Sequence, residues 1–288
     1  MKALAFGEIL FDIYPDARKL GGAPINFSAH LASLDCESYI ISAVGNDLYG
    51  KEAIESIQAL NVKTEYISVN EHSTGVCNVT YKNNEPKYDL SCTSAYDYIE
   101  CENINRLNEQ KFDVFYFGTL AQRSKKSAET LSSVLNTVKF KHIFFDLNLR
   151  QHYYNTEMVL EGLKIADIVK VNRDEFEKIK EILNYQGGNK EFIINFCMEY
   201  NIEILLLTLD KEGAVVYDGN FYYEPCSDCE FVSAVGAGDS FSACFLKNYV
   251  SGEPIEKCLR RANILAGYVV GFETAIPPYS EELKKQII

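Results

Sequence analysis

The chain has 288 residues and a formal net charge of −13, with 41 Asp and Glu side chains against 28 Lys and Arg. Electrostatic binding to nucleic acid or to an anionic membrane surface needs clustered Lys and Arg, and the sequence contains no such cluster. No apolar run approaches the roughly 20 residues of a spanning helix, and the apolar stretch 1–6 reaches Glu8 too early for a signal peptide. We expect a protein of the cytoplasm that binds neither nucleic acid nor membranes.

The nine cysteines are scattered and odd in number, which favours free thiols over a disulfide framework. Cys226 and Cys229 form one C-x-x-C pair. A zinc site of this type needs a second pair or a nearby histidine, and neither is present. The pair is therefore a weak indication of a metal.

Taken in chain order, the pattern begins with a buried strand over 2–6 and an alternating strand over 9–14, which places Asp12 opposite its apolar neighbours. Gly21-Gly22 breaks the pattern, and Pro24 suits the first turn of a helix over 24–34. A hairpin with strands over 75–81 and 88–90 and a turn at 82–85 follows later in the chain. Together with the strand around Asp12, it predicts a small sheet standing off the main one.

Strands and helices alternate regularly through the rest of the chain. We expect strands over 39–44, 112–117, 143–146, 168–171 and 204–209, helices over 124–138, 156–165, 173–183 and 255–270, and a hairpin over 215–222. This rhythm predicts an α/β fold with a mostly parallel sheet that helices cover on both faces.

A glycine-rich turn late in the chain, Gly236-Ala237-Gly238, follows an apolar pair, 231–232, that we interpret as the end of a strand. A helix begins there, and a helix N-terminus offers free N–H groups to an anion. Asp239 lies in the mouth of this turn, where it would repel a phosphate that was merely bound. In a phosphoryl-transfer enzyme it could instead accept the proton of the attacking hydroxyl. The alternative is a helix-start residue after ordinary turn glycines.

Polar side chains also follow the ends of several predicted strands, which is where a parallel sheet places its site. They are Asp146, Asn148 and Arg150 after one strand, Asn172 and Glu175 after the next, and Thr208 and Gly213 after a third. Asn26, beside the Gly-Gly pair, could hydrogen-bond a polyol. Each of these residues alone could be a cap or a turn residue.

Five motifs in this order resemble those of the ribokinase-like, or PfkB-type, carbohydrate kinases over essentially the whole chain. They are Gly21-Gly22-Ala23-Pro24-Ile25-Asn26 (G-G-x-x-x-N), Val44-Gly45-Asn46-Asp47-Leu48-Tyr49-Gly50 (V-G-x-D-x-x-G), Asp146-Leu147-Asn148-Leu149-Arg150 (D-x-N-x-R), Asn172-Arg173-Asp174-Glu175 (N-x-x-E) and Gly236-Ala237-Gly238-Asp239 (G-A-G-D). The resemblance implies a three-layer α/β/α sandwich over 1–288, with segments of a small β lid at about 9–20 and 73–92.

The resemblance also implies roles for individual residues. Asp239 would be the catalytic base, and the backbone N–H groups of Gly236, Ala237 and Gly238 would form an anion hole. Sugar contacts would come from Asp12, Gly22, Asn26 and Arg150, nucleotide contacts from Asn172, Thr208, Gly213 and Asn263, and Glu175 would order Mg²⁺ through water. Arg150 could also face the transferring phosphate.

Within the family, the segments 117–123 and 146–151 are most similar to fructokinases. This adds Gln122 and Arg123 as sugar-pocket candidates, with a solvated loop as the alternative. Departures from the family pattern are Ser233-Ala234 in place of Asp-Thr, Asp210 at the middle glycine of T-x-G-x-x-G, and Thr274 in place of a glycine. Since a carboxylate binds a hard cation better than a hydroxyl does, we expect weak or absent activation by K⁺.

The sequence thus predicts an ATP- and Mg²⁺-dependent sugar kinase that phosphorylates a primary hydroxyl, converting fructose to fructose 6-phosphate. A ribokinase or a 2-keto-3-deoxygluconate kinase is the alternative, because Arg150 would suit a substrate carboxylate. A non-catalytic sugar or nucleotide sensor and, more remotely, a dehydrogenase are the alternatives of other classes. The open edge of the small sheet could also serve as a homodimer contact.

Overall fold

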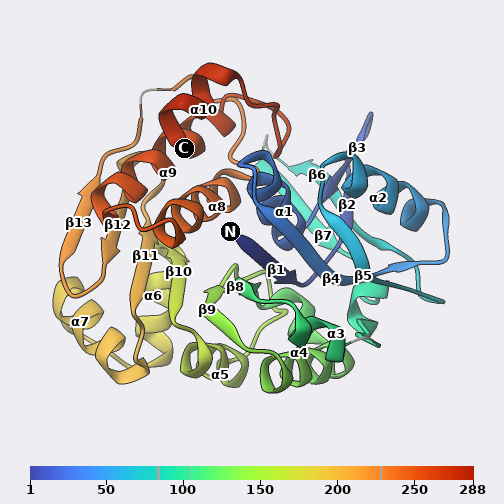
Figure 1. Ribbon diagram of the computed structural model, residues 1–288, viewed down its shortest axis with the longest axis horizontal. Coiled ribbons are helices and arrows are strands. Elements are labelled where there is room, and N and C mark those ends of the chain that lie inside the picture. Colours follow the sequence, from blue (N-terminus) through green and yellow to red (C-terminus); the bar gives the residue numbers. More distant parts are fainter. Residues whose placement is uncertain (83–84, 103, 228) are drawn as a thin grey trace.

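The computed structural model describes residues 1–82, 85–102, 104–227 and 229–288. Its centre is a nine-stranded sheet in the order β13-β12-β11-β10-β9-β8-β1-β4-β5, in which β11 to β13 pair antiparallel and the other neighbours pair parallel (Figure 1). The strands are β1 (Lys2–Phe6), β4 (Glu37–Gly45), β5 (Lys63–Asn70), β8 (Phe112–Phe117), β9 (Phe140–Asp146), β10 (Ile168–Asn172), β11 (Ile204–Thr208), β12 (Ala214–Tyr217) and β13 (Phe221–Glu224). This sheet confirms the predicted α/β fold.

Helices cover both faces of this sheet, as the buried strands require. One face packs against α3 (Ile104–Glu109), α4 (Lys125–Thr137), α5 (Thr156–Ile165), α6 (Arg173–Ile182) and α7 (Asn189–Tyr200). The other packs against α1 (Ala23–Ser33), α2 (Leu48–Ala59), α8 (Ala237–Val250), α9 (Ile255–Val269) and α10 (Glu281–Ile287). The predicted three-layer arrangement is therefore confirmed.

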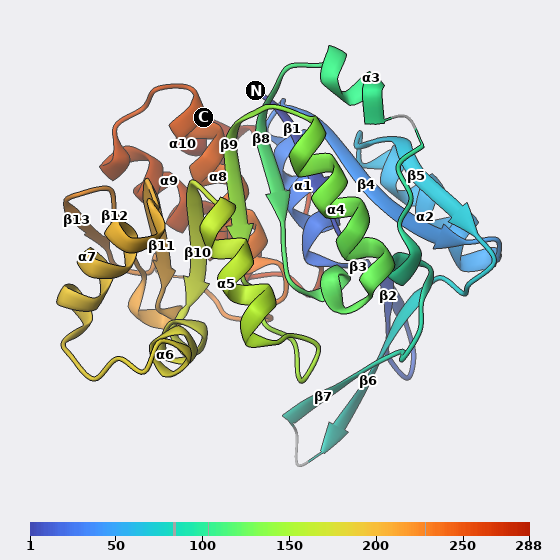
Figure 2. The ribbon, with the colours of Figure 1, turned by 90° about the horizontal axis from the view of Figure 1, so that it is seen from below.

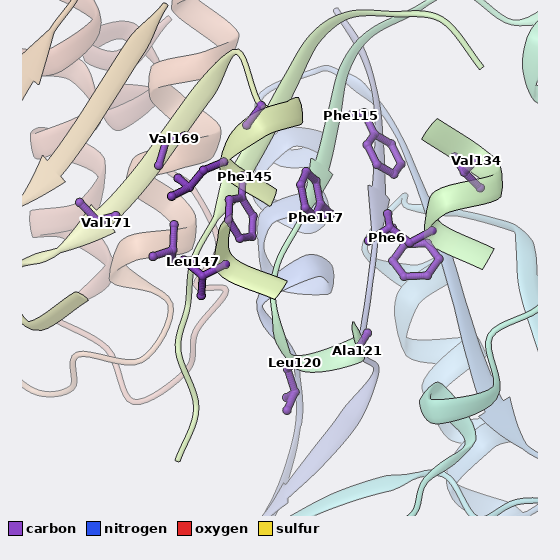
Figure 3. Close-up of a cluster of buried hydrophobic side chains, with 14 of the residues drawn as sticks. Phe6, Phe115, Phe117, Leu120, Ala121, Val134, Phe145, Leu147, Val169 and Val171 are labelled. Carbon is purple, nitrogen blue, oxygen red and sulfur yellow. The ribbon is translucent and has the colours of Figure 1, made fainter. Parts of the chain in front are cut away.

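Alternation along the strands divides the core into two clusters. In β1, Leu4 and Phe6 enter one cluster, whereas Ala3 and Ala5 enter the other. Figure 3 shows the first cluster, where Phe6 lies near aromatic rings from β8 and β9. Burial on both faces explains why these strands are continuous apolar runs in the sequence.

A second, smaller sheet stands off the main one, as the sequence predicted. Its order is β3-β2-β6-β7, and its strands are β3 (Arg18–Gly21), β2 (Leu10–Ile13), β6 (Gly75–Lys82) and β7 (Glu85–Leu90). Strand β2 pairs parallel with β6, and Figure 2 shows β6 and β7 projecting away from the body of the molecule. Residues 83–84 of the predicted hairpin turn lie outside the described residues.

The strand expected to end at 231–232 is wrong. This segment has no strand structure, and Phe231 and Val232 are 70% and 47% exposed. The N–H groups of Val232 and Ser233 both donate to the Val270 carbonyl at the end of α9, so the backbone is tied to a helix rather than to a sheet. In the described parts of the chain, no helix is long and apolar enough to cross a membrane.

Candidate active site

The N-terminus of α8 lies open because its sequence supplies no cap. The N-cap residue, Gly236, adopts the left-handed region at φ 81°, and no side chain accepts from the first N–H groups. The Ala237 N–H donates to the Ala234 carbonyl over 3.3 Å. Gly238 belongs to the first turn, whose N–H groups have no intrahelical acceptor. Of the three predicted anion-hole donors, Ala237 is thus partly engaged within the turn itself.

Gly236 is needed for both space and conformation, whereas a side chain on Gly238 would meet only Lys170. A Cβ atom on Gly236 would lie 2.6 Å from the Ala275 carbonyl oxygen, and one on Gly238 would lie 3.1 Å from Lys170 Nζ. The second distance identifies a residue that the sequence reasoning missed, because it places the Lys170 ammonium beside the anion hole.

Lys170 is held in place by a buried ion pair. Its Nζ lies 3.1 Å from Asp146 Oδ1, the two side chains are 8% and 1% exposed, and Tyr116 donates to the other Asp146 oxygen over 3.4 Å. Burial alone would lower the pKa of Lys170, but the carboxylates of Asp146, Glu175 and Asp239 raise it. Lys170 therefore stays cationic, and it supplies a fixed positive charge where a phosphoryl group would develop negative charge.

Asp239 lies at the third helical position of α8 and is partly buried. Burial and the nearby Asp146 carboxylate raise its pKa to about 6, against the lowering effects of Asn26, Lys170 and Arg150. Its Oδ2 accepts a hydrogen bond of 2.9 Å from Asn26 Nδ2. A carboxylate that is mostly ionised at neutral pH and still basic has the properties of a general base.

Helix α1 brings Asn26 to Asp239. Its N-cap residue, Gly22, has φ 115°, and a Cβ atom there would lie 2.5 Å from the Glu8 carbonyl oxygen, so the close approach needs glycine. Asn26 Oδ1 is buried without a hydrogen-bond partner among the described residues. The structure thus joins Gly22, Asn26 and Asp239, which the sequence predicted separately.

Asp12 and Arg150 approach the same region from the small sheet and from the loop after β9. Burial raises the pKa of Asp12, whereas the charge of Arg150 lowers it. No ion pair between the described residues involves Arg150, which is exposed. An enclosed cavity of about 30 Å³, lined by Asp12 and Asn26 among others, has room for water but not for a sugar.

Gln122 and Arg123 have partners inside the protein. Gln122 Nε2 donates to the Gly118 carbonyl over 2.7 Å. Arg123 forms a buried pair with Asp97, at 2.7 Å from Nε to Oδ1, and its guanidinium lies between the rings of Tyr96 and Tyr153. Of the three Arg123 guanidinium nitrogens, Nη1 is buried without a hydrogen-bond partner among the described residues. Their sugar contacts stay a prediction.

Asn172 and Glu175 cap the start of α6 with each other. Asn172 Oδ1 accepts from the Glu175 N–H, and Glu175 Oε2 accepts from the Asn172 N–H, at 2.9 and 2.8 Å. Glu175 Oε1 also accepts from the Leu149 N–H at 2.9 Å, so this carboxylate ties α6 to the loop that carries Arg150. Burial raises the pKa of Glu175, and the Lys170 charge opposes this shift.

The other residues predicted to bind the nucleotide lie on or against β11, β12 and β13. Thr208 pairs in register with Asn172. Asn263 Nδ2 donates to the Glu224 carbonyl over 3.1 Å, and a Cβ atom on Gly213 would lie 2.1 Å from the same oxygen. Asp210, which departs from the family glycine, adopts φ 51°, a left-handed conformation that glycine enters most easily.

The structure also adds Glu8 to the set, a second residue that sequence reasoning missed. Glu8 is 4% exposed, and its Oε1 accepts from the Ala23 N–H at the start of α1. A charged residue between two buried apolar stretches was the signal in the sequence, as it was for Lys170 within Ile168–Asn172.

The geometry agrees with comparisons to known proteins. Residues 16–282 match the model of the family described as pfkB family carbohydrate kinase. An ATP-dependent 6-phosphofructokinase from Thermoanaerobacterium thermosaccharolyticum is 24% identical over 95% of this chain and 89% of its own length. A fructokinase from Escherichia coli is 25% identical over 85% of this chain and 83% of its own. An uncharacterized sugar kinase from Pyrococcus horikoshii in complex with ATP superposes with a TM-score of 0.83 at 24% identity, covering 99% of this chain and 100% of its own.

Proposed function

Because the chain belongs to the pfkB family of carbohydrate kinases, we propose that it transfers the γ-phosphoryl group of ATP to a primary hydroxyl of a neutral sugar, with fructose as the first candidate. The observation that carries this proposal is the partly buried Asp239 carboxylate, with its raised pKa, beside an uncapped helix N-terminus. The Asp239 carboxylate can accept a proton, and the free N–H groups at the start of α8 beside it can bind the transferring phosphoryl group.

In the proposed reaction, Asp239 accepts the proton of the sugar hydroxyl as that oxygen attacks the γ-phosphorus. The Gly238 N–H and the Lys170 ammonium face the charge that develops on the phosphoryl oxygens. Asn26 orients Asp239 through its amide. The bond between the γ-phosphorus and the bridging oxygen breaks, and ADP leaves.

Mg²⁺ would neutralise charge on the phosphates when bound. Glu175 is the residue we expect to hold it through water, because each of its two oxygens accepts one backbone N–H and retains a lone pair. The described residues contain no group of three or more His, Cys, Asp or Glu side chains that could hold a metal alone. This fits an ion carried mainly by phosphate oxygens and water.

The charge balance around Asp239 favours a neutral sugar over a sugar phosphate or a sugar acid. Glu8, Asp12 and Asp239 are all close enough to the Arg150 charge for it to lower their pKa values. Lys170 is already paired with Asp146. One unpaired guanidinium among three carboxylic groups would not offset a further anionic group on the substrate.

The small sheet would act as a lid in this proposal. Lys19 of β3 donates to the Glu273 carbonyl over 2.9 Å and so holds the sheet against the segment 273–276. Since the enclosed cavity is too small for a hexose, this contact must open before the sugar enters.

The test is an ADP-release assay with ATP and Mg²⁺ over a panel of fructose, fructose 6-phosphate, ribose and 2-keto-3-deoxygluconate. We expect the highest kcat/KM with fructose. The Escherichia coli fructokinase among the relatives supports this choice, whereas the 6-phosphofructokinase from Thermoanaerobacterium thermosaccharolyticum makes fructose 6-phosphate the main rival. A higher kcat/KM with fructose 6-phosphate would refute the neutral-sugar proposal, and sugar-independent ATP binding without turnover would indicate a sensor.

A further inference from the structure

Glu8 occupies an unusual position, between the main sheet and the small sheet. It lies between the end of β1 at Phe6 and the start of β2 at Leu10, and it is 4% exposed. A buried carboxylate is costly unless it is hydrogen-bonded. The Glu8 carboxylate has such a bond, because its Oε1 accepts from the Ala23 N–H over 3.2 Å.

This hydrogen bond supplies a cap that α1 cannot make for itself. The N-cap residue of α1 is Gly22, which has no side chain, and no local side chain caps the helix. Ala23 is the first residue of α1, and its N–H is one of the groups that a helix start leaves without an intrahelical acceptor. Glu8 therefore fixes the first turn of α1 from a distant strand end.

The same turn positions the Asp239 carboxylate. The Asn26 N–H donates to the Gly22 carbonyl over 3.0 Å, and the Asn26 amide then donates to Asp239 Oδ2 over 2.9 Å. Three hydrogen bonds and one helical turn thus connect the Glu8 carboxylate to the Asp239 carboxylate. A displacement of the first turn of α1 would move the Asn26 amide and break the last contact in this series.

Glu8 also shares its charged surroundings with Asp239. The charges of Arg150, in the loop after β9, and of Asp239, in α8, both shift the pKa of Glu8. The charge of Glu8 in turn raises the pKa values of Tyr96 and of Tyr116 in β8. Burial raises the pKa of Glu8 to about 7, Arg150 lowers it, and Asp239 raises it. Glu8 and Asp239 therefore both lie close enough to Arg150 for its charge to lower their pKa values.

We propose that Glu8 is a positioning residue of the active centre, which holds Asn26 on Asp239 through the start of α1. The proposal rests on the proposed function only for the role assigned to Asp239. The positioning is a property of the folded chain, and it can be measured without turnover.

The experiment compares Glu8→Gln, Glu8→Asp and the exposed control Glu129→Gln with the unmodified chain. Glutamine keeps an oxygen for the Ala23 N–H but loses the charge. Aspartate keeps the charge but is one methylene too short to reach. The readouts are the ¹³C titration of the Asp239 carboxyl, assigned with Asp239→Asn, the hydrogen-exchange rate of the Ala23 amide, and the pH profile of kcat/KM.

We expect Glu8→Gln to keep exchange at Ala23 slow, because its amide oxygen can still accept from the Ala23 N–H. Glu8→Asp should speed exchange at Ala23 and raise the pKa of Asp239, because the hydrogen bond from Asn26 that lowers this pKa is weakened. It should also raise the KM for the sugar by roughly tenfold, since a misplaced Asn26 costs orientation. Glu129→Gln should change none of these quantities.

An unchanged Asp239 titration in Glu8→Asp would overturn the link from Glu8 through Asn26 to Asp239. Unchanged exchange at Ala23 in Glu8→Asp would overturn the positioning role. Should the unmodified chain phosphorylate no sugar, the proposed function fails by itself, whereas the carboxyl titration and the amide exchange still decide the proposal on Glu8.

Discussion

The N-termini of α6 and α8 differ in whether a side chain caps their first backbone N–H groups. Both helices follow strands or loops at the same edge of the main sheet, and both have an acid at the third helical position, Glu175 and Asp239. In α6, Glu175 and Asn172 satisfy each other's backbone N–H groups in a capping box. In α8, Gly236 has no side chain that could cap the helix, and the Asp239 carboxylate accepts a hydrogen bond from Asn26 instead of from the first N–H groups.

The difference shows how a sequence keeps a helix N-terminus available. A capping residue such as Asn172 occupies the N–H groups that an anion would need. Glycine leaves these N–H groups free. Because it has no Cβ atom, it also lets an anion approach the backbone closely. The shorter Asp239 side chain is then available for the proton transfer that we propose, whereas the longer Glu175 side chain binds backbone N–H groups.

The largest expected effect comes from removing the Asp239 charge. Asp239→Asn should fold, because asparagine can still accept from the Asn26 amide, and kcat should fall by roughly 10²–10⁴-fold, which is the usual contribution of a general base. The matched control is Asp174→Asn, an exposed residue of the first turn of α6, whose kcat should stay within about twofold. Near-native turnover in Asp239→Asn would refute the assigned base.

The same variant should be more stable at neutral pH. The native pKa of Asp239 is raised from 3.8 to about 6, so the native state binds its proton more tightly than the unfolded chain does. This contribution to stability is present at low pH and is lost as the pH rises from about 4 to 6. Asp239→Asn should therefore gain about 2–3 kcal/mol relative to the unmodified chain between pH 4 and pH 8, measured by urea unfolding.

Closing the open helix start should have the next largest effect. In Gly238→Val, a branched side chain would fill the anion hole and displace Lys170 from Asp146, so kcat should fall by roughly 10²–10³-fold. Gly238→Ala adds only the Cβ atom and should lose less. Thermal unfolding of both variants separates a blocked site from a damaged fold, and equal activity in the folded valine variant would exclude a role for this turn.

Opening the capped helix start should have a smaller effect. Asn172→Ala removes one partner of the capping box and should cost about 1 kcal/mol of stability in urea unfolding. It should raise the KM for ATP more than the KM for the sugar if Asn172 also approaches the nucleotide. A larger change in the sugar KM would place Asn172 on the sugar side, through the contact between Glu175 and Leu149.

The smallest expected effect concerns K⁺ at the turn before α8. Ser233 has no carboxylate to attract a monovalent cation, and its hydroxyl already accepts from the Val235 N–H over 3.3 Å. Replacing K⁺ with a bulky organic cation at constant ionic strength should leave kcat unchanged. A large loss, restored by millimolar K⁺, would show that backbone carbonyls suffice for such a site.

The sequence predicted the elements of this comparison better than their contacts. The apolar periodicity located β8 and α5 at their observed bounds, and the glycine turn located the start of α8. It could not show that Arg123 lies against Asp97, since that pairing depends on how distant segments pack. Glu8 and Lys170 were missed because a single charged residue in an apolar stretch does not reveal its partner before the fold is known.

The hydrogen bond between Asn26 and Asp239 joins residues that are 213 positions apart. A ribosome that adds roughly 5–20 residues per second would need on the order of 10–40 s to travel between them. During that interval the first turn of α1 can already be synthesised while its acidic partner does not yet exist. The candidate active centre is therefore among the last parts of this molecule to be completed during translation, and an incomplete chain that ends before α8 would contain Asn26 but not Asp239.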